Sequence, residues 1–186
     1  MASRILVIGI VMLALLSGAA IYYLQVYAYY ESIVPEGETD VMLTSLVTGV
    51  PEPILYDAFE AITATSSPIR YRACFTTPQS VALLSETYEY YENAEPLLAP
   101  SWFNCFDAKA VGVALENEEA VAFLGEQNIE YGIDRVVAIL PDGRGFVWHQ
   151  INDYLDHSTI KYTRAKSRKE YTLRINKTAR KQIGER

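Results

Sequence analysis

The stretch "IEYGIDRVVAILPDGRGFVWHQI", residues 129–151, places two runs of β-branched and aromatic side chains on either side of a short turn sequence. The turn contains Pro141-Asp142-Gly143. An Asp-Gly pair between extended runs is a strong hairpin signal, because glycine takes the positive φ that tight turns need. The stretch therefore predicts a hairpin with strands over residues 129–140 and 145–151, and with it an antiparallel sheet.

Four stretches upstream of the hairpin have the composition of short strands. Residues 69–75, "IRYRACF", alternate apolar side chains with basic or small ones, which is the pattern of a half-buried strand. Pro51 and Pro53 interrupt the earliest extended region, because proline cannot donate to a β-ladder and belongs at edges or turns. The four stretches are 41–47, 52–62, 69–75 and 121–125.

Two helices are predicted between these strands. In residues 77–92 apolar side chains recur at the spacing of an amphipathic helix, at Val81, Leu84, Tyr88 and Tyr91. The second helix begins after Asp107, a suitable N-cap, and runs through Val111 and Leu115. The segment 93–106 is rich in proline and aromatic residues and predicts a packed loop. We expect an α+β domain with an antiparallel sheet and both helices packed on one face of it.

The amino terminus carries an apolar run without a charged residue over residues 5–24. As a helix this run is about 30 Å long, which is the hydrocarbon thickness of a bilayer. A core helix of a soluble protein is normally shorter and apolar on one stripe only. A cleaved signal peptide is the stronger alternative, because Ser17-Gly18-Ala19 offers small residues for signal peptidase.

Tyrosines after the apolar run favour a retained anchor over a cleaved one. Aromatic rings with a polar tip settle at the headgroup layer. Arg4 precedes the run and acidic residues follow it, so the positive-inside rule places the amino terminus in the cytoplasm and the body outside. The tyrosines are Tyr22, Tyr23, Tyr27, Tyr29 and Tyr30. The predicted organisation is a transmembrane anchor over 1–30, a linker over 31–40, an extracytoplasmic domain over 41–152 and a basic tail over 153–186.

Charge divides the chain unevenly. Residues 1–159 contain six basic and twenty-one acidic side chains, whereas residues 160–186 contain ten basic and two acidic ones. We expect residues 153–186 to form a mostly unstructured basic extension. Outside the cytoplasm its favoured partners are anionic lipid headgroups or the acidic body, and only a cytoplasmic tail would suggest nucleic acid. A reading frame that runs into neighbouring sequence is the other explanation for its composition.

The chain contains two cysteines, Cys74 and Cys105, at positions thirty-one apart. In an oxidising compartment the natural interpretation is a disulfide, which would stabilise the domain by roughly 3 to 4 kcal/mol in the chain-entropy model. Two buried free thiols are the alternative. We expect no metal site and no cofactor, because the chain has only two histidines and lacks paired Cys-x-x-Cys and glycine-rich phosphate motifs.

A small set of side chains forms the candidate binding site. Arg70 and Arg72 are predicted on one face of a strand, where with Trp102 or Arg135 they could bind an anionic ligand or an acidic protein surface. Surface strands carry such arginine pairs routinely, so a solvated face is the competing interpretation.

His149 lies on a predicted strand, on the same face as Val147 and Ile151. A structural histidine is the favoured interpretation, and a general base is the alternative. No catalytic constellation follows from residue spacing. The acidic residues on and beyond the first predicted helix are read as a solvated face, and they are Glu86, Glu89, Glu92 and Glu95.

Several strings in the chain resemble a family of uncharacterised, single-pass membrane-anchored proteins of alphaproteobacteria. The resemblance covers about residues 1–152 and stops before the basic tail. It implies a bacterial inner-membrane protein with a short anchor and a folded body, and it implies no particular activity. The strings are "IRYRACFTTP" (69–78), "AEPLLAPSWFNCFDA" (94–108), "EYGIDRVVAILPDGR" (130–144) and "VWHQIN" (147–152).

Three functions are compatible with these features. The favoured one is an anchored periplasmic module that binds a ligand or an envelope partner without catalysis. The second is a periplasmic enzyme that uses His149 with a carboxylate. The third is binding of nucleic acid or anionic lipid through the basic tail.

Overall fold

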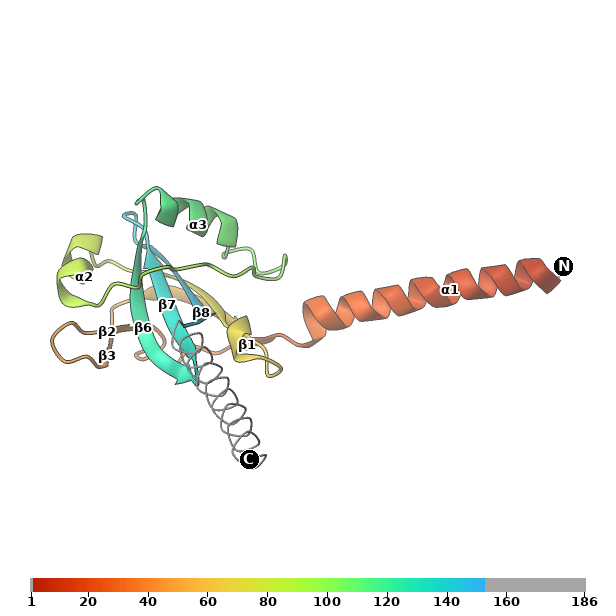
Figure 1. Cartoon of the computed structure of the whole chain (residues 1–186), viewed down its shortest axis with the longest axis horizontal. Coiled ribbons are helices and arrows are strands. Elements are labelled where there is room, and N and C mark those ends of the chain that lie inside the picture. The colour runs from red at the N-terminus through yellow and green to blue at the C-terminus, as the bar shows by residue number, and fades with distance from the viewer. Residues whose placement is uncertain (1, 153–186) are drawn as a thin grey trace, which may run out of the picture. The chain divides into compact units, whose positions relative to one another are not determined.

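The body of the protein contains a six-stranded sheet and a two-stranded sheet, as seen in a computed structural model that describes residues 2–152 (Figure 1). The order in the larger sheet is β1-β4-β5-β8-β7-β6, and its paired strands run antiparallel. Its strands are β1 (Glu31–Ile33), β4 (Asp57–Thr63), β5 (Arg72–Thr76), β6 (Val121–Glu130), β7 (Ile133–Ile139) and β8 (Arg144–Ile151). The α+β class with an antiparallel sheet is therefore confirmed.

The predicted hairpin is formed by β7 and β8, which are neighbours in the sheet. Leu140 donates its backbone N–H to the carbonyl of Arg144 over 2.9 Å, and the N–H of Gly143 donates to the carbonyl of Leu140 over 3.0 Å. Gly143 has φ +87°, which is the left-handed conformation that the Asp-Gly pair predicted. Turn chemistry thus fixes the register of the two central strands.

The first arm of this hairpin is shorter than predicted, because residues 129–140 do not form one strand. β6 continues to Glu130, and the chain then reverses at Tyr131 and Gly132 before β7 begins at Ile133. Gly132 has φ +77°, so this glycine makes a second hairpin within the predicted strand. Its neighbours are apolar or charged rather than typical of turns, which concealed the reversal.

The two proline residues near the start of the body lie in the smaller sheet. β2 (Met42–Thr44) pairs antiparallel with β3 (Pro51–Pro53), and β3 has no other strand partner among the residues that the structure describes. Proline is tolerated in such an edge strand because its missing N–H faces away from the ladder. The predicted strand 52–62 is therefore divided between β3 and β4.

Apolar side chains cover both faces of the larger sheet. Consecutive buried residues along β7 and β8 alternate between two core clusters. Val137 and Val147 belong to one cluster, whereas Val136 and Trp148 belong to the other. Each face therefore requires its own cover, since an apolar sheet face exposed to water is unfavourable.

The two body helices lie on opposite faces, so the prediction that both pack on one face is wrong. α2 (Val81–Thr87) contributes Leu84 to the cluster of Val147, and α3 (Ala108–Glu116) contributes Val111 to the cluster of Trp148. The physical reason is the apolar composition of both faces of the central strands, which one layer of helices cannot cover. The predicted N-cap of α3 is confirmed, because the Asp107 carboxylate accepts from the N–H groups of Lys109 and Ala110.

The first predicted helix is also too long, because α2 ends at Thr87 rather than near residue 92. The following segment runs beside β6, where Tyr91 N–H donates to Ala122 over 2.9 Å and Leu124 N–H donates to Glu89 over 2.9 Å. Tyr88 is buried against the core from outside the helix. Backbone hydrogen bonds with β6 thus end the helix before Tyr88 and Tyr91, although both residues have helical spacing.

The apolar run forms α1 (Ala2–Tyr23), which continues as a π-helix, η1 (Leu24–Ala28). Residues 4–28 are long and apolar enough to cross a membrane, and their side chains are not buried by the body. This helix fits a single span or a signal sequence. The predicted linker is partly structured, because Glu31–Ile33 form β1 at the edge of the sheet beside β4. The predicted basic tail over 153–186 lies outside the described residues.

Candidate binding site around Arg135 and His149

Arg135 on β7 and His149 on β8 meet beside Tyr71, which lies immediately before β5. The Tyr71 and His149 rings stack with centroids 4.6 Å apart and planes 11° from parallel. The Arg135 guanidinium carbon lies 4.8 Å from the centre of the Tyr71 ring, and its Nε donates to His149 Nε2 over 3.1 Å. The stacked rings and the guanidinium therefore hold one another in position.

His149 uses both ring nitrogens in this arrangement. Nδ1 donates to the Pro68 carbonyl over 2.7 Å while Nε2 accepts from Arg135, which requires a neutral ring. Burial and the charge of Arg135 lower the pKa of His149 to about 4. A ring with both nitrogens hydrogen-bonded and a lowered pKa is a weak base. Its contacts instead orient Arg135.

Asp40 lies close enough to Arg135 for the two charges to interact. Its carboxylate accepts hydrogen bonds from the Tyr56 hydroxyl and from the backbone N–H groups of Glu36 and Gly37. Burial opposes ionisation, but the bond from Tyr56, the backbone donors and the charge of Arg135 together lower the pKa of Asp40. Burial and the bond to Asp40 raise the pKa of Tyr56 to about 12. Sequence patterns missed Asp40, Tyr56 and Tyr71, because their partners are distant along the chain.

Arg135 is less buried than Tyr71 and His149. It is half-buried, and within residues 2–152 its terminal nitrogens make no hydrogen bond. A guanidinium held by its Nε and stacked on a ring presents its remaining donors in a fixed orientation, which suits a carboxylate or a carbonyl oxygen. The predicted binding residues Arg135 and His149 therefore do come together.

Arg72 neighbours this cluster, but it is not available for an anion. The side chain is only 4% exposed, and its nitrogens donate to four carbonyls. Two of them belong to the loop over 93–106, with Nε 2.8 Å from Leu97 O and Nη2 3.1 Å from Leu98 O. The other two are Ile69 O and Tyr71 O. Burial lowers the pKa of Arg72 to about 10, so the guanidinium remains charged near neutral pH and clamps the loop.

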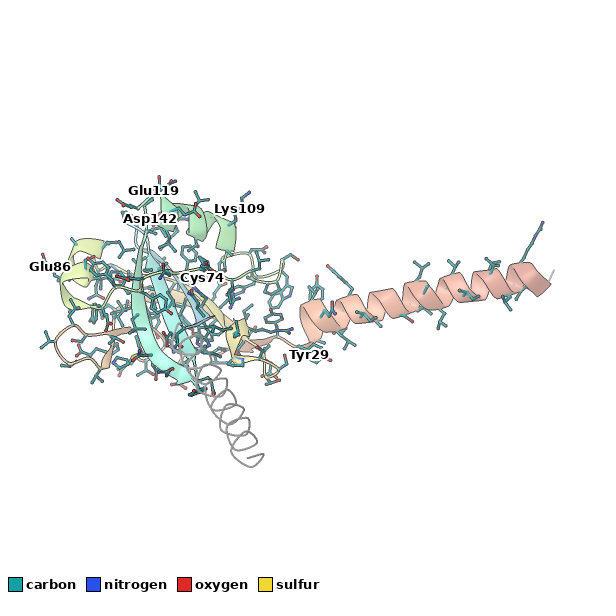
Figure 2. All side chains as sticks on the ribbon, in the orientation of Figure 1. Tyr29, Cys74, Glu86, Lys109, Glu119 and Asp142 are labelled. Carbon is teal, nitrogen blue, oxygen red and sulfur yellow. A yellow bond between two sulfur atoms is a disulfide. The ribbon has the colours of Figure 1, made fainter. Side chains whose placement is uncertain are left out.

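Arg70 and Trp102 form a second group near the apolar helix. The prediction that Arg70 shares a strand face with Arg72 is wrong, because Arg70 ends a 3₁₀ turn, η2 (Pro68–Arg70), before β5 begins. The Arg70 guanidinium lies 5.6 Å from the Tyr30 ring centre, and the Trp102 ring lies 5.9 Å from it. Tyr29 marks this junction between helix and body in Figure 2. The five predicted binding residues therefore belong to three different sets of contacts.

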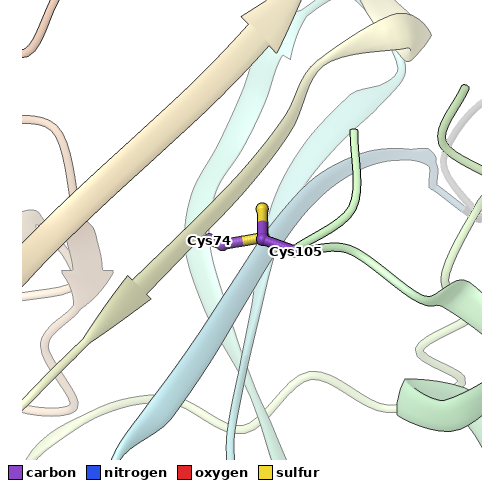
Figure 3. The surroundings of a disulfide bond; sticks show 2 residues. All are labelled: Cys74 and Cys105. Atoms are coloured by element: carbon purple, nitrogen blue, oxygen red, sulfur yellow. A yellow bond between two sulfur atoms is a disulfide. The ribbon is translucent and has the colours of Figure 1, made fainter. Parts of the chain in front are cut away.

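The two cysteines are joined as predicted. Cys74 on β5 and Cys105 in the loop over 93–106 form a disulfide with Cα atoms 6.2 Å apart (Figure 3). The bond and the Arg72 clamp both attach this loop to the same strand. Within residues 2–152 no group of three or more acidic, histidine or cysteine side chains could hold a metal ion.

An exposed apolar patch lies on the connection between β2 and β3 and on α2. Val47 is 92% exposed, and the N–H of Leu46 donates to Thr87 O at the end of α2 over 2.9 Å. Glu86 points outward from α2 (Figure 2), and Glu52 accepts a hydrogen bond from Thr48 over 3.0 Å in the connection between β2 and β3. We define the hairpin patch as the exposed side chains of Leu46, Val47, Val50 and Leu83.

Comparison with protein families gives a match for the body. The model of DUF6446, a family of unknown function, matches residues 41–163. The match begins at the body, and it extends beyond residue 152, where the resemblance seen in the sequence was expected to stop. No curated protein and no solved structure matches the chain.

Proposed function

The chain belongs to DUF6446, a family of unknown function, and we propose that it is a membrane-anchored periplasmic binding module whose partner is another envelope protein. The observation that carries the proposal is the apolar helix over residues 4–28, whose side chains the body does not bury. An apolar helix of this length is most stable in lipid. Retention of this helix would hold the amino terminus on the cytoplasmic side of a bacterial inner membrane and the body in the periplasm.

The disulfide supports the same location for the body. Disulfides persist in oxidising compartments and are rare in the cytosol. The Cys74–Cys105 bond fixes the loop over 93–106, which has no regular secondary structure of its own. A periplasmic body would keep this bond.

The hairpin patch is the surface that best fits a protein partner. Glu52 accepts a hydrogen bond from Thr48 in the connection between β2 and β3, Glu86 belongs to α2, and the body over residues 31–152 holds nineteen acidic and five basic side chains. A complementary surface would therefore have an apolar hollow with lysine or arginine at its rim. Contiguous exposed apolar groups with a polar rim are typical of interaction sites.

The enzyme alternative has less support from the contacts. It requires His149 to act as a base, and both nitrogens of that ring are hydrogen-bonded. The alternative of nucleic-acid or lipid binding through the basic tail concerns residues outside those described.

The location is tested on membranes from cells that express the full chain. We expect the full-length product to resist alkaline extraction, and a phosphatase fused at residue 40 to be active because it is exported. The two thiols should react with maleimide only after reduction. Full-length product in the soluble fraction, with thiols that react without reductant, would refute the proposal.

The partner surface is tested by photocrosslinking in native membranes. A benzophenone amino acid replaces Val47 in one variant and Tyr131 in the control, since both side chains are well exposed. We expect a crosslinked protein from position 47 that is missing from position 131. Identical patterns from both positions would show that the hairpin patch is not the binding surface.

A further inference from the structure

We propose that the body rests on the phospholipid surface through a membrane-facing surface formed by Tyr27, Tyr30, Arg70, Leu98 and Trp102. The inference rests on the proposed anchor and goes beyond it, because an anchor alone would leave the body free to tumble on its tether. The proposed occupant of this surface is the headgroup layer of the bilayer in which the helix lies.

Trp102 places this surface at the depth of the membrane interface. Its indole Nε1 donates to the carbonyl of Val26 over 2.7 Å, and its ring stacks on Tyr27 with centroids 6.3 Å apart. Val26 lies in η1, at the end of the apolar helix. Tryptophan and tyrosine prefer the boundary between hydrocarbon and water. A loop of the body is therefore bonded to the helix at the depth where the helix leaves the hydrocarbon.

The position of Val26 at the end of the helix makes this contact available. The last carbonyls of a helix have no intrahelical partner, and the Tyr30 N–H donates to the Tyr27 carbonyl rather than to that of Val26. The Trp102 indole satisfies the Val26 carbonyl. The junction is thereby a specific contact and not only a flexible connection.

Leu98 projects from the same loop and is 80% exposed. Its backbone is fixed, because Arg72 Nη2 donates to its carbonyl and Arg72 Nε donates to the carbonyl of Leu97. The Cys74–Cys105 bond attaches the other end of the loop to β5. A large apolar side chain on a loop whose backbone is already fixed can enter the lipid with little further cost of ordering the backbone.

Arg70 supplies the polar contact. Its guanidinium lies 5.6 Å from the centre of the Tyr30 ring, and its Nη1 is buried without a hydrogen-bond partner among residues 2–152. An unpaired buried donor is unfavourable, so a small rotation toward a lipid phosphate oxygen would be stabilising. The rest of the body is mostly acidic and is repelled by anionic headgroups, which favours the orientation with Arg70 toward the membrane.

The test uses the full chain in nanodiscs of phosphatidylcholine and phosphatidylglycerol, with or without bromine on the acyl chains near the headgroups. Bromine quenches tryptophan fluorescence on contact. The chain has two tryptophans, and Trp148 is 0% exposed, so it serves as the shielded reference. We expect brominated lipid to quench the native protein and to leave Trp102→Phe unchanged.

Two further variants separate a surface contact from proximity to the helix. Leu98→Glu should reduce the quenching, because a carboxylate is unfavourable in lipid, whereas the exposed control Tyr131→Glu should retain it. Arg70→Gln should reduce the quenching in discs that contain phosphatidylglycerol.

The outcomes distinguish the anchor from the surface. Protein that elutes with the discs but fluoresces equally in plain and brominated lipid would refute the membrane-facing surface and leave the anchor intact. Equal quenching of Leu98→Glu and the native protein would also refute the surface. Protein that elutes apart from the discs would refute the anchor, and the surface with it.

Discussion

Protonation of His149 should make the folded body unstable in acid. The ring is 6% exposed and neutral in the fold, where Nδ1 donates to Pro68 and Nε2 accepts from Arg135. In the unfolded chain the imidazole has an ordinary pKa of 6.5, whereas burial and the Arg135 charge lower it to about 4 in the folded protein. As pH falls through this window, the unfolded chain binds a proton that the folded chain does not.

The magnitude follows from the width of that window. Each pH unit between the two pKa values changes the free energy of unfolding by about 1.4 kcal/mol for one proton. The stabilisation from the neutral ring is thus fully present above pH 6.5 and is lost toward pH 4, for a total of about 3 kcal/mol. The stabilisation that the ionised Asp40 contributes is lost only as pH falls below its ordinary pKa of 3.8, so this loss overlaps little with the histidine window.

The assay is urea unfolding of the full chain in detergent micelles at several pH values from 7.5 to 4, about the range over which histidine linkage acts. His149→Gln is the comparison, because glutamine can donate and accept but cannot bind a proton in this range. Below pH 6.5 we expect the free energy of unfolding of the native protein to fall more steeply with decreasing pH than that of His149→Gln. The difference in slope should correspond to close to one proton. Parallel pH profiles for the two proteins would refute the assignment of a buried neutral ring.

Three other perturbations test the packing around this site. Cys105→Ser should lower the free energy of unfolding by roughly 3 to 4 kcal/mol, because it removes the disulfide between two residues that are 31 positions apart. The measurement compares this variant with the native protein, with and without reductant. An equal difference between the two proteins in both conditions would contradict this explanation. Arg72→Met should cost about 1 to 3 kcal/mol and increase protease cleavage of the loop over 93–106, since buried carbonyls lose their donors; unchanged cleavage would show that the clamp is not required. Gly145→Ala should destabilise the fold by about 1 to 3 kcal/mol, because the added Cβ would lie 2.1 Å from the buried Phe75 ring. Gly112→Ala, which adds a Cβ in open space on α3, should stabilise the fold by roughly 0.5 to 1 kcal/mol. Urea midpoints that shift in the same direction for both variants would refute this contrast.

Several features of the fold follow from signals that lie close together in the chain. The Asp142-Gly143 pair predicted the turn between β7 and β8, and Asp107 predicted the start of α3. The apolar run at the amino terminus predicted a membrane-length helix from composition alone. These predictions succeeded because turns, caps and helix length depend on neighbouring residues.

Predictions that required knowledge of distant partners failed. Tyr88 and Tyr91 have helical spacing with Leu84, but the chain near Tyr91 bonds to β6 instead of extending α2. The alternation in "IRYRACF" placed Arg70 and Arg72 together, although a 3₁₀ turn separates Arg70 from the strand. Local periodicity cannot report which backbone groups from elsewhere will compete for the same segment.

The sequence by itself determined the apolar helix, the central hairpin and the presence of a cysteine pair, because each depends on composition or on residues a few positions apart. The tertiary structure alone decided that the sheet is covered on both faces and that Arg72 is bound by carbonyls while Arg135 is half-buried against Tyr71 and His149. Two arginines with the same chemistry have different roles because their surroundings are supplied by segments far apart in the chain. Burial and hydrogen-bond partners, and not residue type, determine which of them can bind a ligand.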